Sequence, residues 1–360
     1  MKIIDHYITK TLLTYTLAVL LIWLSIYSFF NFLAELDSVG KENYTILEAF
    51  KYITLKMPEV AYSQASPVIL LGCVLGMGHL ATTEQLLIFR VAGFSLLKIT
   101  WLTVKNALIF IFFIILLGEL LAPILTKYSE NMRSSALGAN SLSLSQNGFW
   151  IRDSNNFINV ENNIDGKFFN QITVIEVNSL NEIERVIKSK NALFDGNSLD
   201  MSNSEIFTIG KSGNFESISL KERNSYNKTV SFDRDLVDSL EKEPKDLTTW
   251  TIIKQIEFLT DNKLRSGVLE VELYNRLVRP LTLIAMILLS MLFILGSTRD
   301  ATLGRKIFFG VSLGLSFELL SRVGGALALS FDFSPLLSSM LPTVIVMVIS
   351  ITLLIKKSIS

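Results

Sequence analysis

The sequence predicts an α-helical membrane protein with six transmembrane helices and a β-sandwich domain inserted between the third and the fourth. Three observations lead to this fold class. Half of the residues are hydrophobic and only 18% are charged, whereas soluble domains carry roughly 25%. Six apolar runs approach the length that crosses about 30 Å of hydrocarbon. One long polar stretch in the middle of the chain has the composition of short strands and turns.

The six apolar runs define the predicted transmembrane helices. The first is too long for the core of a signal peptide, so we expect it to be retained as a helix. The fourth is short, and the fifth contains Glu318 and Arg322. The runs cover residues 11–32, 61–80, 99–122, 280–296, 307–331 and 335–355.

Positive charge in the short connections predicts the orientation, because Lys and Arg are retained on the cytoplasmic side. With six spans, the basic segments alternate consistently, so both termini are predicted to be cytoplasmic and the insert periplasmic. The connection between the second and third spans is then cytoplasmic too. The segments used are Lys2 and Lys10, Arg299 with Arg305 and Lys306, and Lys356 with Lys357.

Two short helices are predicted outside the spans. Apolar residues recur at helical spacing between Ile46 and Met57, which predicts an amphipathic helix in the outer interface that Pro58 ends or kinks. Residues 83–93 begin with helix-starting residues and stop at Gly93, a residue suited to a C-cap. This second helix could simply return the chain to the membrane, or it could dock into a groove on a separate ATPase.

The insert covers residues 141–246, and its short runs of β-forming residues alternate with Asn, Asp, Gly and Ser turns. It separates a first membrane half, residues 1–140, from a second half, residues 247–360. The second half begins with a helix that Thr248 or Thr249 can cap. One face of that helix is predicted to carry Trp250, Ile253, Ile256 and Leu259.

Known catalytic patterns are missing from the sequence. It contains no phosphate-binding loop of the G-x-x-x-x-G-K-[ST] type, so the chain is not itself a conventional ATPase. Two histidines and one cysteine, Cys73, leave no His-based triad, zinc motif or disulfide framework. We therefore expect neither a catalytic residue nor a metal site nor a bound cofactor.

Ionisable residues at membrane depth cost roughly 2.5–3.5 kcal/mol each and normally face a cavity or a partner. The intramembrane candidates are Glu119, Glu318 and Arg322. Glu318 and Arg322 lie four residues apart and could pair with each other. Arg133, just beyond the third span, could hold a phosphate at the water interface or could remain solvated.

Six short motifs follow one another along the chain. They are Asp5-x-Tyr7-Ile8-x-Lys10-Thr11, the loop from Glu84 to Ala92-Gly93-Phe94-Ser95, Gly118-Glu119-x-x-Ala122-Pro123, Gly148-Phe149-Trp150-Ile151-Arg152-Asp153-x-Asn155-Asn156-Phe157, Pro280-Leu281, and Arg299 with Gly304-Arg305. Their order and spacing resemble the LptF/LptG family of lipopolysaccharide-export permeases, and the LptG branch more closely.

The resemblance implies a permease of an ABC-type exporter in the inner membrane of a Gram-negative cell. An LptF-like and an LptG-like chain would form a heterodimer on two copies of the ATPase LptB, which uses ATP and Mg²⁺. Lipopolysaccharide would enter from the outer leaflet, rise into periplasmic β-jellyroll domains and pass to LptC and LptA. The segment 83–93 becomes the ATPase-coupling helix, with Glu84, Gln85, Arg90, Ala92 and Gly93 as its candidate residues.

The chain departs from the family pattern at two places. The acid that usually precedes Leu in the coupling helix is replaced by Gln85, and Glu84 stands one position earlier. Lysines late in the first span and before the second are often present in LptG proteins, and this chain has Asn31 and Glu59 there. The lipid A-binding candidates are therefore Arg133, which matches a basic family position, with Asn31, Phe32 and Glu59, and the ligand is expected to carry fewer phosphates.

Three other classes remain open at this point. An ABC permease for another lipid or lipoprotein would share the coupling helix but need no jellyroll. A secondary transporter would show inverted repeats and broken helices at the bilayer midplane. A lipid-modifying enzyme would need clustered carboxylates or histidines at one membrane face, and Glu35 with Asp37 is the nearest such pair.

Overall fold

The computed structural model describes residues 2–138, 148–164, 166–178, 180, 182–212, 215–240, 242–294, 303–331 and 333–359. The chain divides into two compact units. The helical unit consists of Met1–Arg133 with Glu270–Ser360, and the β unit consists of Ser134–Leu269. The boundaries between the units fall inside two helices, α6 (Ala122–Ala136) and α9 (Gly267–Ile294). Arg299 and the start of the predicted insert, residues 141–147, lie outside the described residues.

Six helices of the described chain are long and apolar enough to cross a membrane, and the predicted helical membrane fold is confirmed. The helical elements are α1 (Lys2–Glu35), a 3₁₀ turn (Leu36–Ser38), α2 (Ile46–Ser63), α3 (Ala65–Thr82), α4 (Gln85–Val91), α5 (Leu96–Leu116), a π-helical segment (Leu117–Leu121), α6 (Ala122–Ala136), α9 (Gly267–Ile294), α10 (Leu303–Phe331) and α11 (Pro335–Ile359).

Pro280, predicted to begin the fourth span, lies inside helix α9, and Pro58, predicted to end or kink its helix, lies inside α2. Pro123 is the second residue of α6, which continues directly from the π-helical segment Leu117–Leu121 within one span. The fourth span therefore begins at Gly267 rather than at Pro280, and the third continues beyond Ala122 through α6.

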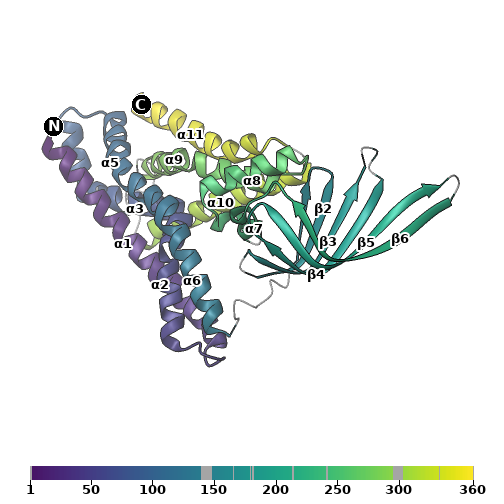
Figure 1. Cartoon of the computed structure of the whole chain (residues 1–360). Helices are drawn as coiled ribbons and strands as arrows, with labels where there is room; N and C mark the ends of the chain where they lie inside the picture. Colours follow the sequence, from purple (N-terminus) through teal and green to yellow (C-terminus); the bar gives the residue numbers. More distant parts are fainter. Residues whose placement is uncertain are drawn as a thin grey trace. The chain divides into compact units, whose positions relative to one another are not determined.

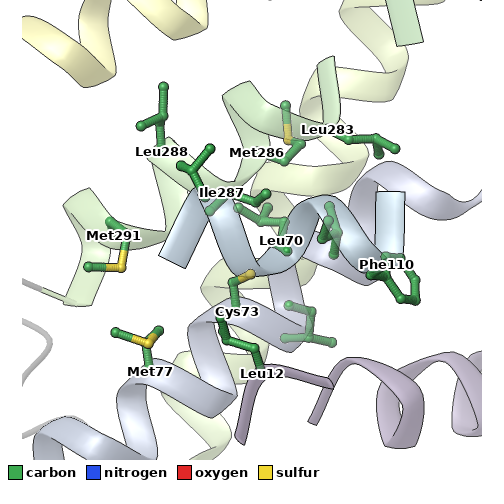
Figure 2. Packing of buried hydrophobic residues seen from close by; sticks show 14 of the residues in the cluster. Leu12, Leu70, Cys73, Met77, Phe110, Leu283, Met286, Ile287, Leu288 and Met291 are labelled. Atoms are coloured by element: carbon green, nitrogen blue, oxygen red, sulfur yellow. The ribbon is translucent and has the colours of Figure 1, made fainter. Parts of the chain in front are cut away.

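Helix α3 lies at the centre of the helical unit, and most of its residues are buried. Figure 2 shows Leu70, Cys73 and Met77 of α3 beside apolar side chains of α9 such as Met286 and Ile287. The glycines of its G-x-x-x-G spacing, Gly72 and Gly76, lie against α1. The corresponding pair in α10, Gly310 and Gly314, lies against α3. Both spacings thus serve contacts within this chain.

The described residues of the β unit form six antiparallel strands in sequential order, which confirms the β-rich insert. They form one sheet rather than the two facing sheets of a sandwich, and α7 (Arg234–Leu240) supplies part of the opposing apolar layer. The strands are β1 (Phe149–Asp153), β2 (Asn156–Ile164), β3 (Phe168–Val177), β4 (Ile183–Phe194), β5 (Ser198–Ser212) and β6 (Phe215–Thr229).

The sheet curves along its strands (Figure 1), and two residues within the strands have left-handed backbone angles. Gln171 in β3 has φ +54° and Asn203 in β5 has φ +52°. The register stays the same on both sides of each residue: Asn170–Asn191 is followed by Ile172–Ser189, and Ser202–Ser225 by Ser204–Arg223. The register of β3 with β4 shifts between Glu176 and Val177, an irregularity of the kind that bends a strand.

Helix α8 (Thr249–Asp261) follows a 3₁₀ turn (Pro244–Asp246), and the Thr248 side chain caps it by accepting a hydrogen bond from Thr251 N. Trp250, on the face predicted to carry four apolar residues, is 68% exposed, whereas Ile252 and Gln255 are buried. The buried Gln255 side chain donates a hydrogen bond to Ser239 Oγ at 2.7 Å.

Candidate functional site

The first candidate feature is helix α4, which exposes an apolar surface. Leu86 and Phe89 are buried, so they anchor the helix to the protein. Leu87, Ile88 and Val91 are 44%, 63% and 82% exposed. We call these three residues the α4 patch. A short helix that buries one side and presents three aliphatic residues on the other has the form of a docking element.

Both ends of α4 are held by special backbone conformations. Glu84 precedes the helix with φ +61°, and its side chain makes no capping hydrogen bond. Gly93 has φ +88°, and Phe94 N donates to Phe89 O at 3.1 Å, which closes the C-terminus in the manner that favours glycine. Arg90 and Ala92 are exposed. The predicted helix 83–93 is thus a shorter helix with its candidate residues arranged around its two ends.

The second candidate feature gathers charges from α1, α2 and α6. Arg133 Nε donates to Glu35 Oε1 at 2.6 Å, and its guanidinium lies 6.0 Å from the Tyr44 ring centroid and 5.4 Å from that of Tyr52. Lys56 Nζ lies 3.2 Å from Glu130 Oε1. Glu35, Lys56, Glu59, Glu130 and Arg133, with Tyr44 and Tyr52, form what we call the α1–α2–α6 cluster. Arg133 is therefore paired, not simply solvated.

The other lipid-binding candidates lie within or beside this cluster. Glu59 Oε2 accepts a hydrogen bond from Thr126 Oγ1 at 3.2 Å. Asn31 lies one helical turn before Glu35 on α1, and its Nδ2 donates to Tyr27 O at 2.8 Å. Phe32 is partly buried beside it in the sequence, and no polar contact involves it. The structure brings Arg133 and Glu59 into one cluster, with Asn31 near its α1 edge.

Local interactions maintain the charge states in the α1–α2–α6 cluster. Burial, together with the neighbouring Glu35 carboxylate, raises the pKa of Tyr44 well above its ordinary value, so the phenol stays neutral. Burial alone would lower the pKa of Lys56, but its interaction with Tyr52 and the charges of Glu130 and Glu59 raise it overall. The lysine therefore stays cationic at any physiological pH.

The third feature is a polar network around Glu119, in the π-helical segment. Tyr62 Oη donates to Glu119 Oε1 at 2.8 Å, and Arg276 Nη1 lies 3.8 Å from Glu119 Oε2. Arg276 Nε also donates to Glu272 Oε1 at 2.9 Å. Arg279 Nη1 donates to Tyr62 O at 2.9 Å and stacks on the Tyr62 ring at 4.1 Å. The expected membrane cost of Glu119 is thus offset by partners within the chain.

Sequence reasoning did not identify Tyr62, Arg276 or Arg279. A usable signal existed, because Glu272 and Arg276 have the i, i+4 spacing of a helical ion pair. The fourth span predicted to begin at Pro280 leaves both residues outside that helix, so their spacing was not used. The remaining intramembrane pair is also in contact, since Arg322 Nε lies 3.3 Å from Glu318 Oε1. Within the described residues, no group of three or more His, Cys, Asp or Glu side chains is arranged to hold a metal ion.

These features define a class of protein. In the part of the chain that the structure describes, six helices able to span a membrane, a β-rich insert and an exposed short helix after the second of these helices are the parts of a multi-pass permease with a β-rich domain. The comparisons with known proteins then give the family. A sequence model described as lipopolysaccharide export system permease LptF/LptG matches residues 6–356. The chain belongs to this family.

Two relatives show how far the similarity extends. The chain is 25% identical over 356 residues to the lipopolysaccharide export system permease protein LptG of Escherichia coli (strain K12), with 99% of each chain covered. It is 25% identical over 359 residues to the LptG protein of Haemophilus influenzae, with 98% of each covered. The similarity therefore extends over the helices on both sides of the insert and over the insert itself.

Proposed function

We propose that this chain is the LptG-like half of the lipopolysaccharide exporter, coupled to a separate ATPase through α4. The observation that carries the coupling is the α4 patch of Leu87, Ile88 and Val91, exposed beside Arg90. When these exposed aliphatic side chains enter a groove of a partner, their apolar surface is removed from water, which favours binding. The chain itself contributes no nucleotide chemistry, so ATP and Mg²⁺ belong to an LptB-like dimer.

The proposed orientation has both termini and α4 in the cytoplasm and the β unit in the periplasm. It rests on the distribution of Lys and Arg between the short connections. The α1–α2–α6 cluster then belongs to the outer side of the membrane, because α2 connects the first two spans there. Lipopolysaccharide entering from the outer leaflet would meet Arg133, Glu59 and Asn31 with its headgroup, while Phe32 would face its apolar part.

The β unit would receive the lipid after it leaves the membrane. An LptF-like permease would pair with this chain, and the two would enclose the cavity that lipopolysaccharide enters. LptC and LptA would accept lipopolysaccharide from the β domains. This role is supported by the family match, which covers the whole β unit.

Copurification from native membranes tests the coupling. Ile88→Asp places a charge in the α4 patch at a residue that is 63% exposed, so the fold should survive while the ATPase is lost. Arg90→Glu should have the same effect. Lys357→Gln, an exposed change on the same predicted side, is the matched control and should retain the ATPase. Full ATPase recovery with Ile88→Asp would contradict the proposal.

The identity of the cargo is tested by the lipids that accompany the complex. Mass spectrometry of the purified complex should find a second permease and lipid A species. Arg133→Ala should reduce ATPase stimulation by lipopolysaccharide while the subunits stay assembled, since the arginine is at the charge cluster and not at α4. Recovery of the chain with another ATPase and without lipid A would favour an exporter of a different lipid.

A further inference from the structure

A polar cavity lies between α9, α10 and α11. It has a volume of about 430 Å³, and Ser66 of α3 completes its wall. The lining includes Glu272, Arg279, Glu318 and Arg322. All four residues belong to helices that are apolar enough to cross a membrane. Such a concentration of charge in spanning helices is costly unless the charges serve a purpose at that place.

The four charged residues are only partly satisfied by one another. The Arg322 side chain is 70% exposed, and its contact with Glu318 uses Nε alone. In the described part of the chain, Glu318 and Glu272 each use Oε1 in an ion pair, and their Oε2 atoms make no ion pair. Arg322 therefore presents both terminal guanidinium nitrogens, and the two acids each retain an oxygen that can accept a hydrogen bond.

The balance of signs limits the ligand. A purely anionic group would meet two carboxylates together with the arginines, and a purely cationic group would meet the arginines. A group that carries one phosphate and one ammonium matches both signs. The walls also contain Phe317 and Leu329, so the same cavity can accept apolar atoms next to the charged ones. These properties are those of a zwitterionic lipid.

The depth of the cavity is consistent with a lipid headgroup. Glu272 lies near the N-terminus of α9, and Ser339 lies near the N-terminus of α11. Glu318 is near the middle of α10. At 1.5 Å per residue, Arg322 is about 13 Å from the end of α10 at Phe331. The cavity thus leads from one membrane surface part of the way into the helical unit. The Ser339 hydroxyl, which lines it, is buried with no hydrogen-bond partner among the described residues.

We propose that this cavity binds the phosphoethanolamine headgroup of a membrane lipid, with the Arg322 guanidinium on the phosphate and the Glu272 and Glu318 carboxylates on the ammonium. A bound lipid would neutralise the exposed arginine within the span. It would also fill the space between α9, α10 and α11, where side chains alone do not. This site is distinct from the α1–α2–α6 cluster, and it does not depend on the proposed cargo.

Native mass spectrometry of the full chain in mild detergent can test the proposal. Phosphatidylethanolamine, phosphatidylcholine and phosphatidylglycerol are added in turn at equal concentration. Phosphatidylethanolamine should bind most tightly, because the choline group has no N–H donor and the glycerol group has no positive charge. Soluble glycerophosphoethanolamine should compete weakly, which separates a lipid site from a site for the free headgroup. Equal binding of the three lipids, or full displacement by the soluble headgroup, would overturn the proposal.

Substitutions test whether phosphatidylethanolamine binds in this cavity. Arg322→Gln should weaken phosphatidylethanolamine binding about tenfold, the effect of losing one charge-assisted hydrogen bond. Lys105→Gln removes another cation that is half exposed and paired with a carboxylate, Asp5 at 2.8 Å, and it should change nothing. Unchanged binding in a folded Arg322→Gln protein would refute the site.

A second variant keeps the test decisive if Arg322→Gln does not fold. Glu318→Gln removes the acid beside Arg322 and leaves the cavity more positive. The preference should then move from phosphatidylethanolamine toward phosphatidylglycerol. Folding of each variant can be followed by the protection of Cys73, which is 1% exposed in the native chain. A Glu318→Gln protein that keeps the original preference would count against the proposal.

Discussion

Replacing Gly118 with alanine is the sharpest test of the network around Glu119. An alanine Cβ at this position would lie 2.1 Å from Cγ and Cδ2 of the Tyr62 ring. Atoms in contact cannot approach this closely, so the ring must move. Tyr62 is only 9% exposed, and its ring has no free space in which to turn. The substitution should therefore displace Tyr62 rather than be absorbed.

The cost follows from the contacts that Tyr62 makes. Its hydroxyl donates to the Glu119 carboxylate at 2.8 Å, and Arg279 stacks on its ring at 4.1 Å. A hydrogen bond to a charged group contributes about 1.5–3 kcal/mol and a cation–π contact about 0.5–2 kcal/mol, so Gly118→Ala should destabilise the chain by about 2–5 kcal/mol.

The assay uses the single cysteine of the chain. Cys73 is buried in the core of α3, α9 and α1, so a thiol-reactive fluorophore labels it only after unfolding. Tyr62→Phe is the matched variant, because it keeps the ring and removes only the hydroxyl. In the double variant, Tyr62→Phe should add little to Gly118→Ala, since the hydroxyl bond is already broken. A Gly118→Ala protein with the native unfolding midpoint, or fully additive effects, would refute the reasoning.

Three further predictions follow from single contacts. Gly314→Ala should be more destabilising than Gly310→Ala in the same Cys73 assay, because the new Cβ at Gly314 meets Cα and Cβ of Pro67 at 3.0 and 2.8 Å, whereas at Gly310 it meets the movable end of a leucine side chain. Backbone N–H groups of the β4–β5 turn hold the pKa of Asp195 below its ordinary value. Its contribution to stability is therefore present above the unfolded pKa of about 3.9 and is lost as the pH falls through the lower folded value. Urea unfolding should show Asp195→Asn to be less stable than the native chain at pH 7 but not at a pH below both values. Glu59→Lys should increase the preference for lipid A with two phosphates over lipid A with one, measured by ATPase stimulation, and an unchanged preference would argue against ligand contact at this position.

Much of the helical unit could be predicted from sequence because the signal is local. A spanning helix needs about 20 consecutive apolar residues, and this requirement is met or failed within one segment. The wrong boundaries lie where contacts with distant parts of the chain, and not the local sequence, determine the structure. Pro280 looked like a boundary, yet α9 begins at Gly267 because Glu272, Arg276 and Arg279 find partners inside the protein. Polar residues at a helix end can be read correctly only with those partners in view.

Single residues of the candidate site could be predicted from the sequence, but the residues with which they form ion pairs could not. Arg133 could be selected as a basic residue at the end of a span. Its partner, Glu35, is 98 residues away, and the sequence indicated it only as a carboxylate close to Asp37. In the β unit, the composition indicated strands, but the positive φ values of Gln171 and Asn203 carry no sequence signature like that of glycine. The curved single sheet was therefore taken for two sheets.

The charge balance of the α1–α2–α6 cluster bears on which lipid this chain would bind. The cluster contains two cations, Lys56 and Arg133, and three carboxylates, Glu35, Glu59 and Glu130. A phosphate that binds Arg133 must displace or share it with Glu35, which already holds its Nε at 2.6 Å. The two tyrosine rings keep the guanidinium in place during that exchange, so binding need not order a free side chain. Each additional phosphate would meet an excess of carboxylates. We therefore propose that the cluster binds a headgroup with few phosphates, since each further phosphate would meet another carboxylate.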